Sequence, residues 1–124
     1  MPARSSGLYA LVAAALAATP ALAADVANGQ KVFRQCQACH VVDQEQNRVG
    51  PHLVGIIGRP AGAVEGFKYS PSMAESGIVW TPETIAEYLA DPRGYVSGNR
   101  MAFAGLRNAE EIADVIAYLE NAGS

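Results

Sequence analysis

The chain has 124 residues, with nine basic side chains, twelve acidic side chains and two cysteines. This length suits one domain and leaves no room for two independent cores. The formal charge of −3 argues against a nucleic-acid binder that neutralises phosphates, and two cysteines are too few for a disulfide framework.

The first 23 residues have the pattern of a signal peptide. Arg4 supplies the positive start, residues 8–18 form a short uncharged run, and residues 21–23 are a small-residue cleavage site. A membrane span would need about 20 strongly apolar residues, and this run is shorter and rich in alanine. We therefore expect an exported, periplasmic protein whose mature domain, residues 24–124, carries a formal charge of −4.

Apolar spacing and start signals predict four helices in the mature chain, within residues 25–37, 70–75, 81–90 and 108–122. The two middle helices open with Ser70-Pro71 and Thr81-Pro82, where a hydroxyl caps the helix and proline fits the first turn. The last helix opens with the capping-box pattern Asn108–Glu111 and ends at Gly123. The fold class is therefore small and all-α.

The segments between these helices, residues 41–66 and 91–107, are rich in glycine and proline and are predicted as loops. No repeat and no convincing alternating strand interrupts them. Loops of this length in a small domain usually serve a function or wrap a bound group. We therefore expect a cofactor at the centre of the domain.

The run Cys36-Gln37-Ala38-Cys39-His40 is the signature of c-type haem attachment. Two thiols three residues apart can add to the two vinyl groups of one haem, and the adjacent imidazole then reaches the iron. A thioredoxin-like motif would need a βαβ setting, a zinc site would need more Cys or His ligands, and a disulfide at this spacing is strained. The sequence therefore predicts one haem c, bound covalently through Cys36 and Cys39, with His40 as an iron ligand.

Three side chains are candidates for the second axial ligand: Met73, Met101 and His52. Met101 lies in a turn-rich loop, 61 residues after His40, which is enough chain to reach the opposite face of a haem. Met73 lies at helical spacing and fits a core position better, and His52 fits a solvated loop position. We therefore predict Met101 as the ligand, with Met73 and His52 as the alternatives.

Ligation by His and Met would fill both axial positions of the iron and leave no open site for a substrate. This favours a one-electron carrier and not an enzyme. The alternative is a haem enzyme or ligand sensor, peroxidase-like or gas-binding, in which Met101 is readily displaced.

The order of these motifs along the mature chain resembles the class I c-type cytochromes, in the mitochondrial-like and bacterial cytochrome c2 branch. The matching segments are Gly29–Phe33, Cys36–His40, Arg48–Pro51, Gly58-Arg59, Gly66–Tyr69, Trp80, Tyr88–Pro92, Gly98–Phe103 and Ala117–Leu119. The resemblance implies a small cytochrome c fold, with helices and long loops wrapped around one haem. It also implies a monomer that docks with redox partner proteins, in a respiratory or photosynthetic chain or with a periplasmic dehydrogenase.

The same resemblance implies roles for individual residues. Arg59, Tyr69 and Trp80 would hold the haem propionates, and Tyr88 would lie near the sulfur of Met101. Trp80 can only donate a hydrogen bond, which suits a carboxylate acceptor. Taken singly, the two aromatic residues Trp80 and Tyr88 also fit simple packing positions, and Arg59 fits a solvated surface position.

Two further contacts are implied near the helices and the attachment motif. The carbonyl of Pro51 would receive the ring N–H of His40. Gly29 and Phe33 would allow the first helix to cross the last one closely.

The chain departs from the family pattern at its charged residues and in the methionine loop. Ser97 replaces the usual proline before Gly98, so the loop that carries Met101 is less stiff. Arg100 replaces the usual lysine, and only Lys31 and Lys68 remain of the lysines with which family members commonly dock. The last 17 residues carry four acids and no base, so the net charge does not exclude a positive face elsewhere.

Overall fold

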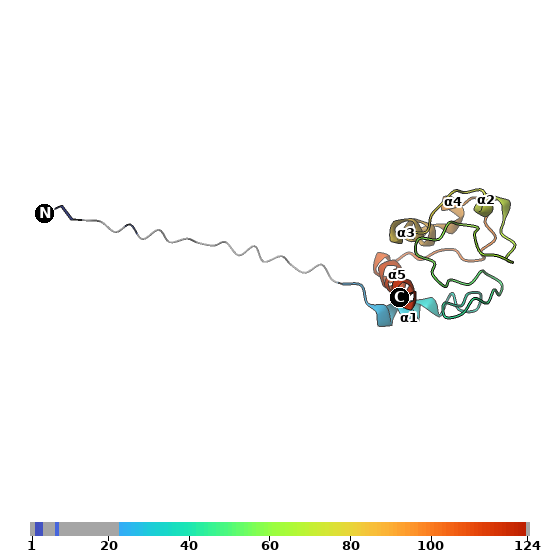
Figure 1. Cartoon of the computed structure of the whole chain (residues 1–124), viewed down its shortest axis with the longest axis horizontal. Coiled ribbons are helices and arrows are strands. Elements are labelled where there is room, and N and C mark those ends of the chain that lie inside the picture. Colours follow the sequence, from blue (N-terminus) through green and yellow to red (C-terminus); the bar gives the residue numbers. More distant parts are fainter. Residues whose placement is uncertain (1, 4–6, 8–22, 124) are drawn as a thin grey trace.

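Five helices joined by long irregular segments make up the part of the chain that the structure, a computed structural model, describes (Figure 1). This part comprises residues 2–3, 7 and 23–123, and the predicted signal peptide falls largely outside it. The helices are α1 (Val26–Phe33), α2 (Pro71–Ala74), α3 (Pro82–Ala90), α4 (Pro92–Tyr95) and α5 (Ala109–Ala122).

The helices α1 and α5 cross at close range, which brings the two ends of the domain together (Figure 1). A Cβ atom added to Gly29 would lie 1.9 Å from the backbone oxygen of Asp114, so only glycine fits at the crossing. The rings of Phe33 and Tyr118 pack beside it with their centroids 5.3 Å apart. The expected close crossing is confirmed.

Hydrogen bonds to the carboxylate of Asp114 also connect this helix pair. Its two carboxylate oxygens accept from the backbone N–H of Asp25 and from the side-chain amide of Asn28, both at 2.8 Å. Asp25 also caps α1 by accepting from the N–H of Asn28 at 3.1 Å. The first turn of α1 is therefore tied to the middle of α5.

The core lies between the α1–α5 pair and α3. On α5 the buried side chains recur at helical spacing: Ile112, Val115, Ile116 and Leu119. Ile85 and Tyr88 of α3 are buried against this core, and α3 contacts α5 directly. Burial of these apolar faces holds the helices together, since none of them is long enough to be stable alone.

The start signals of α2, α3 and α5 act as the sequence predicts, whereas α4 was not predicted. Ser70, Thr81 and Asn108 each accept hydrogen bonds from the first turn of their helix. Residues 91–107, however, are not all loop, because Pro92–Tyr95 forms α4. Asp91 ends α3 and at the same time caps α4 by accepting from the N–H of Gly94 at 3.0 Å, so one Asp-Pro pair serves two helices.

The long loops are held by backbone bonds and not by a sheet. Within the described residues, strand-like pairing is limited to one antiparallel bridge between Pro60 and Val79. Next to it the N–H of Trp80 donates to the oxygen of Arg59 at 2.9 Å. None of the helices in the described part is long and apolar enough to cross a membrane.

Candidate functional site

The attachment motif follows α1 directly in a run of tight turns. The N–H of Cys36 donates to the oxygen of Phe33 at 2.7 Å, and the N–H groups of Cys39 and His40 donate to the oxygen of Cys36 at 3.1 and 2.9 Å. Both thiols are free and half-buried. Burial, with a smaller effect of the nearby Cys39, raises the pKa of the Cys36 thiol. Cys36 thus shows no sign of the lowered pKa that is typical of a reactive dithiol.

A metal site of another kind also lacks support around these cysteines. Among the described residues, no group of three or more His, Cys, Asp or Glu side chains lies close enough together to hold a metal ion.

The imidazole of His40 is fixed on one side by its backbone surroundings. Its Nδ1 lies 2.7 Å from the oxygen of Pro51, and since a carbonyl only accepts, Nδ1 carries the proton. Burial lowers the pKa of His40, an effect partly opposed by this hydrogen bond. The ring is thus a neutral imidazole whose Nε2 lone pair is available to a metal. The expected contact between Pro51 and His40 is confirmed.

Gly50 gives the His40 ring its space. A Cβ atom at this position would lie 2.4 Å from Cε1 and 2.7 Å from Nδ1 of the ring. Gly50 is itself held in place, because its N–H donates to the oxygen of Cys39 at 3.0 Å. The segment Gly50-Pro51 therefore both makes room for the imidazole and orients it.

Met101 lies in the other long loop, where it packs against the hydrophobic core and contacts Tyr88 of α3. The hydroxyl of Tyr88 donates to the sulfur of Met101 at 3.8 Å, as the family resemblance implied. Burial raises the pKa of Tyr88 to about 12, so the hydroxyl keeps its proton at neutral pH. The Tyr88 ring also packs against Trp80, with centroids 5.0 Å apart. Met101 is thus held near a buried aromatic pair and a hydrogen-bond donor.

The other two candidates for the second ligand have different surroundings. Met73 lies in α2, half-buried against the hydrophobic core. His52 accepts from the N–H of Val54 through Nδ1 at 3.3 Å, and this Nδ1 also lies 3.5 Å from a guanidinium nitrogen of Arg59. These contacts fit a core methionine and a loop-bracing histidine.

Arg59 and Trp80 are joined by a backbone hydrogen bond next to the Pro60–Val79 bridge, and Tyr69 lies near enough to Arg59 to affect the pKa of its guanidinium. The guanidinium of Arg59 donates to the oxygen of His52 at 2.9 Å and to the oxygen of Val54. Neutral carbonyls do not cancel its charge, and burial lowers the pKa of Arg59. The Tyr69 hydroxyl accepts from the N–H of Val64 at 3.1 Å, which leaves its own proton free to donate, and Trp80 is buried. Each of the three side chains thus carries a hydrogen-bond donor: the guanidinium of Arg59, the hydroxyl of Tyr69 and the indole N–H of Trp80.

The comparison with protein families is decisive for this arrangement. Residues 26–123 match the family model described as Cytochrome c. The chain belongs to the cytochrome c family. Cytochrome c type-1 of Ascaris suum is 53% identical over 97 residues, which cover 77% of this chain and 87% of that protein. Cytochrome c2 of Blastochloris viridis is 43% identical over 115 residues, which cover 92% of this chain and 88% of that protein.

A solved structure agrees with the fold. Cytochrome cH from Methylobacterium extorquens matches with a TM-score of 0.75 and 39% identity, over 78% of this chain and 98% of that one. The predicted class I c-type cytochrome of the c2 branch and its small all-α fold are confirmed. As a family member with the Cys36–His40 motif, this cytochrome carries one covalently bound haem c and serves as an electron carrier.

The residues fit the haem on observations of the structure itself. The thiols of Cys36 and Cys39 are free to form thioethers, and His40 presents an unprotonated Nε2. The sulfur of Met101 lies within reach of the buried Tyr88 hydroxyl. Two thiols next to an imidazole suit covalent attachment and ligation of a haem, and a methionine thioether is one of the groups that can serve as its second axial ligand.

Two residues of the site were not predicted from the sequence as contributors. Gly50 looks like one of many loop glycines, although its place directly before Pro51 and ten residues after His40 marks it in retrospect. Asn99 looks like a turn residue, and its role appears only when its three side-chain hydrogen bonds are seen. A side-chain amide in a loop gives no signal of which backbone groups it will reach.

Proposed function

We propose that this protein is a soluble, periplasmic one-electron carrier and not an enzyme, with His40 and Met101 as the axial ligands of its haem iron. The observation that carries the proposal is that two potential ligands come from separate loops and each has a hydrogen-bond partner that orients it. Pro51 holds His40 at 2.7 Å between Nδ1 and oxygen, and Tyr88 contacts the Met101 sulfur at 3.8 Å.

The protein side chains would divide the work of holding and tuning the haem. Bound haem supplies a reversible one-electron couple at its iron. Cys36 and Cys39 keep the group attached through thioethers. The Pro51 carbonyl fixes the tautomer and direction of the imidazole and increases its basicity. A thioether from Met101 favours the reduced iron, which raises the reduction potential relative to ligation by two histidines.

Arg59, Tyr69 and Trp80 are proposed to bind the haem propionates. Their donors are a guanidinium, a hydroxyl whose proton is free, and an indole N–H. The positive charge of Arg59 would compensate a propionate taken partly out of water. Tyr88 is proposed to contact the haem pocket through its ring and Met101 through its hydroxyl.

We also propose that residues 1–23 are a signal peptide and that residues 24–124 form the cytochrome c domain. Haem c is attached outside the cytoplasm, which fits the leader pattern. The similarity to the Blastochloris viridis cytochrome c2 covers 92% of this chain, which is more than residues 24–124 alone make up. N-terminal sequencing of the holoprotein from a periplasmic extract tests the cleavage, and an intact residue 1 would contradict it.

The absorption spectrum of the oxidised holoprotein tests the ligands. Ligation by His40 and Met101 predicts a low-spin spectrum with a weak sulfur-to-iron charge-transfer band, and Met101→Ala removes this band. Met73→Ala serves as the matched control and retains it. A high-spin spectrum, or ready binding of carbon monoxide or peroxide by the unaltered protein, would contradict the carrier function and favour a haem enzyme or ligand sensor.

A further inference from the structure

The side chain of Asn99 connects the Met101 loop to the short helix α4. Its Nδ2 donates to the oxygens of Pro92 and Val96 at 2.8 and 2.9 Å. Its Oδ1 accepts from the backbone N–H of Met101 at 2.9 Å. One side chain thus links the first residue of α4 and the residue directly after this helix to the residue whose sulfur is proposed to bind iron.

Only one orientation of the Asn99 amide agrees with these partners. Exchanging its oxygen and nitrogen would place a donor against the N–H of Met101 and an acceptor against two carbonyls. An aspartate would lose both donors, and alanine would lose all three bonds. The contacts therefore require the particular chemistry of an amide.

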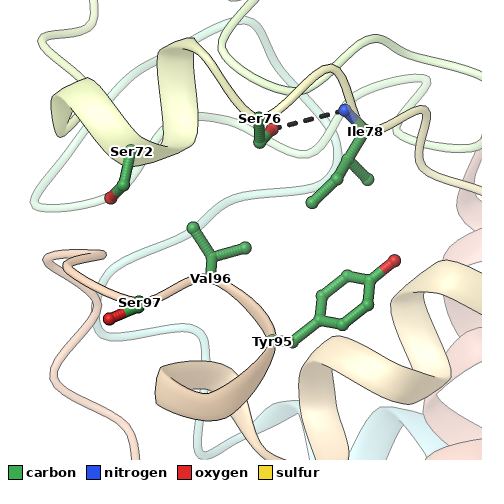
Figure 2. A pocket seen from close by; sticks show the side chains of 6 residues that line it. All are labelled: Ser72, Ser76, Ile78, Tyr95, Val96 and Ser97. Atoms are coloured by element: carbon green, nitrogen blue, oxygen red, sulfur yellow. Dashed lines mark hydrogen bonds between the residues drawn. The ribbon is translucent and has the colours of Figure 1, made fainter.

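On one side, few other contacts restrain the loop around Asn99. Ser97 stands where a proline would restrict the backbone, and Gly98 adopts a φ of +83°, which favours glycine. Figure 2 shows that Val96 and Ser97 face Ser72 and Ser76 across a hollow of about 360 Å³. This hollow is lined by Ser72, Ser76, Ile78, Tyr95, Val96 and Ser97.

Apart from Gly98, where an added Cβ would lie 3.2 Å from the Oγ of Ser72, the hollow leaves this side of the loop without close neighbours. Val96, by contrast, is only 4% exposed and anchors the end of α4. Asn99 donates to the oxygen of this buried residue and accepts from the N–H of Met101. These bonds restrain the backbone of Met101 relative to the end of α4.

We propose that Asn99 is a positioning residue that keeps Met101 on the iron, in place of the stiffness that a proline at position 97 would provide. The role rests on the proposed ligation by Met101. Loss of the Asn99 bonds frees the loop to move toward the hollow, so an external ligand competes more easily for the iron. The Asn99 hydrogen bonds therefore determine how readily an external ligand displaces Met101 from the iron.

Imidazole binding to the oxidised holoprotein tests this role, with the sulfur-to-iron charge-transfer band as the readout. We expect Asn99→Ala to lower the dissociation constant for imidazole about tenfold, equivalent to about 1.4 kcal/mol. Asn99→Asp keeps the size of the side chain and the acceptor for the Met101 N–H but loses both donors, and it should shift the constant in the same direction. It also provides a folded variant if the alanine protein loads haem poorly.

Asn108→Ala is the matched control. Asn108 caps α5 by accepting from the N–H groups of Glu110 and Glu111 at 2.8 and 3.2 Å, so its loss lowers the unfolding midpoint without touching the methionine loop. The control should leave the imidazole constant within about twofold of the unaltered protein, well short of the tenfold change.

The outcomes separate the two proposals. If the unaltered protein shows no charge-transfer band, the proposed ligation by Met101 is wrong. If the band is present and both Asn99 variants bind imidazole like the unaltered protein, the Asn99 role is overturned while the ligation stands. An equal gain in imidazole affinity in Asn108→Ala would also overturn the Asn99 role, because general destabilisation would then be the cause.

Discussion

At the scale of single residues, the site depends on groups kept in one protonation state by their surroundings. Burial disfavours the charged form of His40 and lowers its pKa, while the hydrogen bond to the Pro51 oxygen opposes this in part and keeps the ring proton on Nδ1. Tyr88 is neutral because burial raises its pKa to about 12. A protonated His40 would have no lone pair on Nε2 for a metal. An ionised Tyr88 would place an unpaired charge in a buried position.

The raised pKa of Tyr88 predicts how stability changes at alkaline pH. An unfolded tyrosine ionises near pH 10, whereas the folded protein keeps the Tyr88 proton until about pH 12. Between these values the unfolded state binds fewer protons, so the free energy of unfolding falls as pH rises. The stabilisation is complete below pH 10 and is lost through pH 12.

Tyr88→Phe removes this dependence and serves as the comparison. From pH 9 to pH 11.5, the reduced unaltered holoprotein should lose about 1–2 kcal/mol of unfolding free energy relative to Tyr88→Phe, allowing for solvent screening. Denaturant unfolding at the two pH values measures the difference. A gap between the two proteins that stays constant with pH would contradict the burial of this hydroxyl.

At the scale of the helices, the sequence predicts the structure correctly where one local pattern determines it. The caps at Ser70, Thr81 and Asn108 act between residues at most three apart, so the sequence alone predicts them. The helix α4 was missed because Asp91-Pro92 also reads as a stop signal, and four residues are too few to show periodicity.

The residues of the site also differ in whether a local sequence pattern predicts them. The motif Cys36–His40 is contiguous and was recognised directly, while the proximity of Tyr88 and Met101 was available only through the family resemblance. The contact of Gly50 with the His40 ring depends on the path of a loop that has no regular period.

The crossing of α1 and α5 gives a prediction at this scale. Gly29→Ala should lower the free energy of unfolding by about 2 kcal/mol or more, because the new Cβ would meet the backbone of Asp114 and force the helices apart. This cost outweighs the gain of about 1 kcal/mol in helix propensity. Denaturant unfolding of the holoprotein measures it.

Gly123→Ala is the matched control for this crossing. Gly123 has a φ of −89°, and its nearest neighbour to an added Cβ is the oxygen of Leu119 at 3.6 Å, an ordinary contact. The control should be neutral or slightly stabilising, by up to about 1 kcal/mol. Equal losses in both variants would show that helix contact is not the cause.

At the scale of the whole molecule, charge is distributed unevenly along the fold. Residues 24–107 contain as many acidic as basic side chains, so the net charge of −4 in the mature chain comes entirely from residues 108–124. These residues form α5 and its ends. The loop of Met101 lies outside this acidic helix, and Arg100, directly before Met101, is exposed. An overall acidic protein can therefore present a locally positive surface to a partner.

Arg100→Glu is expected to slow electron exchange with an acidic redox partner about threefold to tenfold at low ionic strength, because local charge steers the encounter. The dependence of the rate on salt should weaken at the same time, since screening then has less attraction to remove. Stopped-flow kinetics at several salt concentrations measures both effects. Glu120→Lys changes the net charge by the same amount in the opposite direction, on α5, and should leave the low-salt rate within about twofold if docking is local. If the two variants instead shift the rate by equal factors in opposite directions, net charge governs the encounter and Arg100 has no special place in docking.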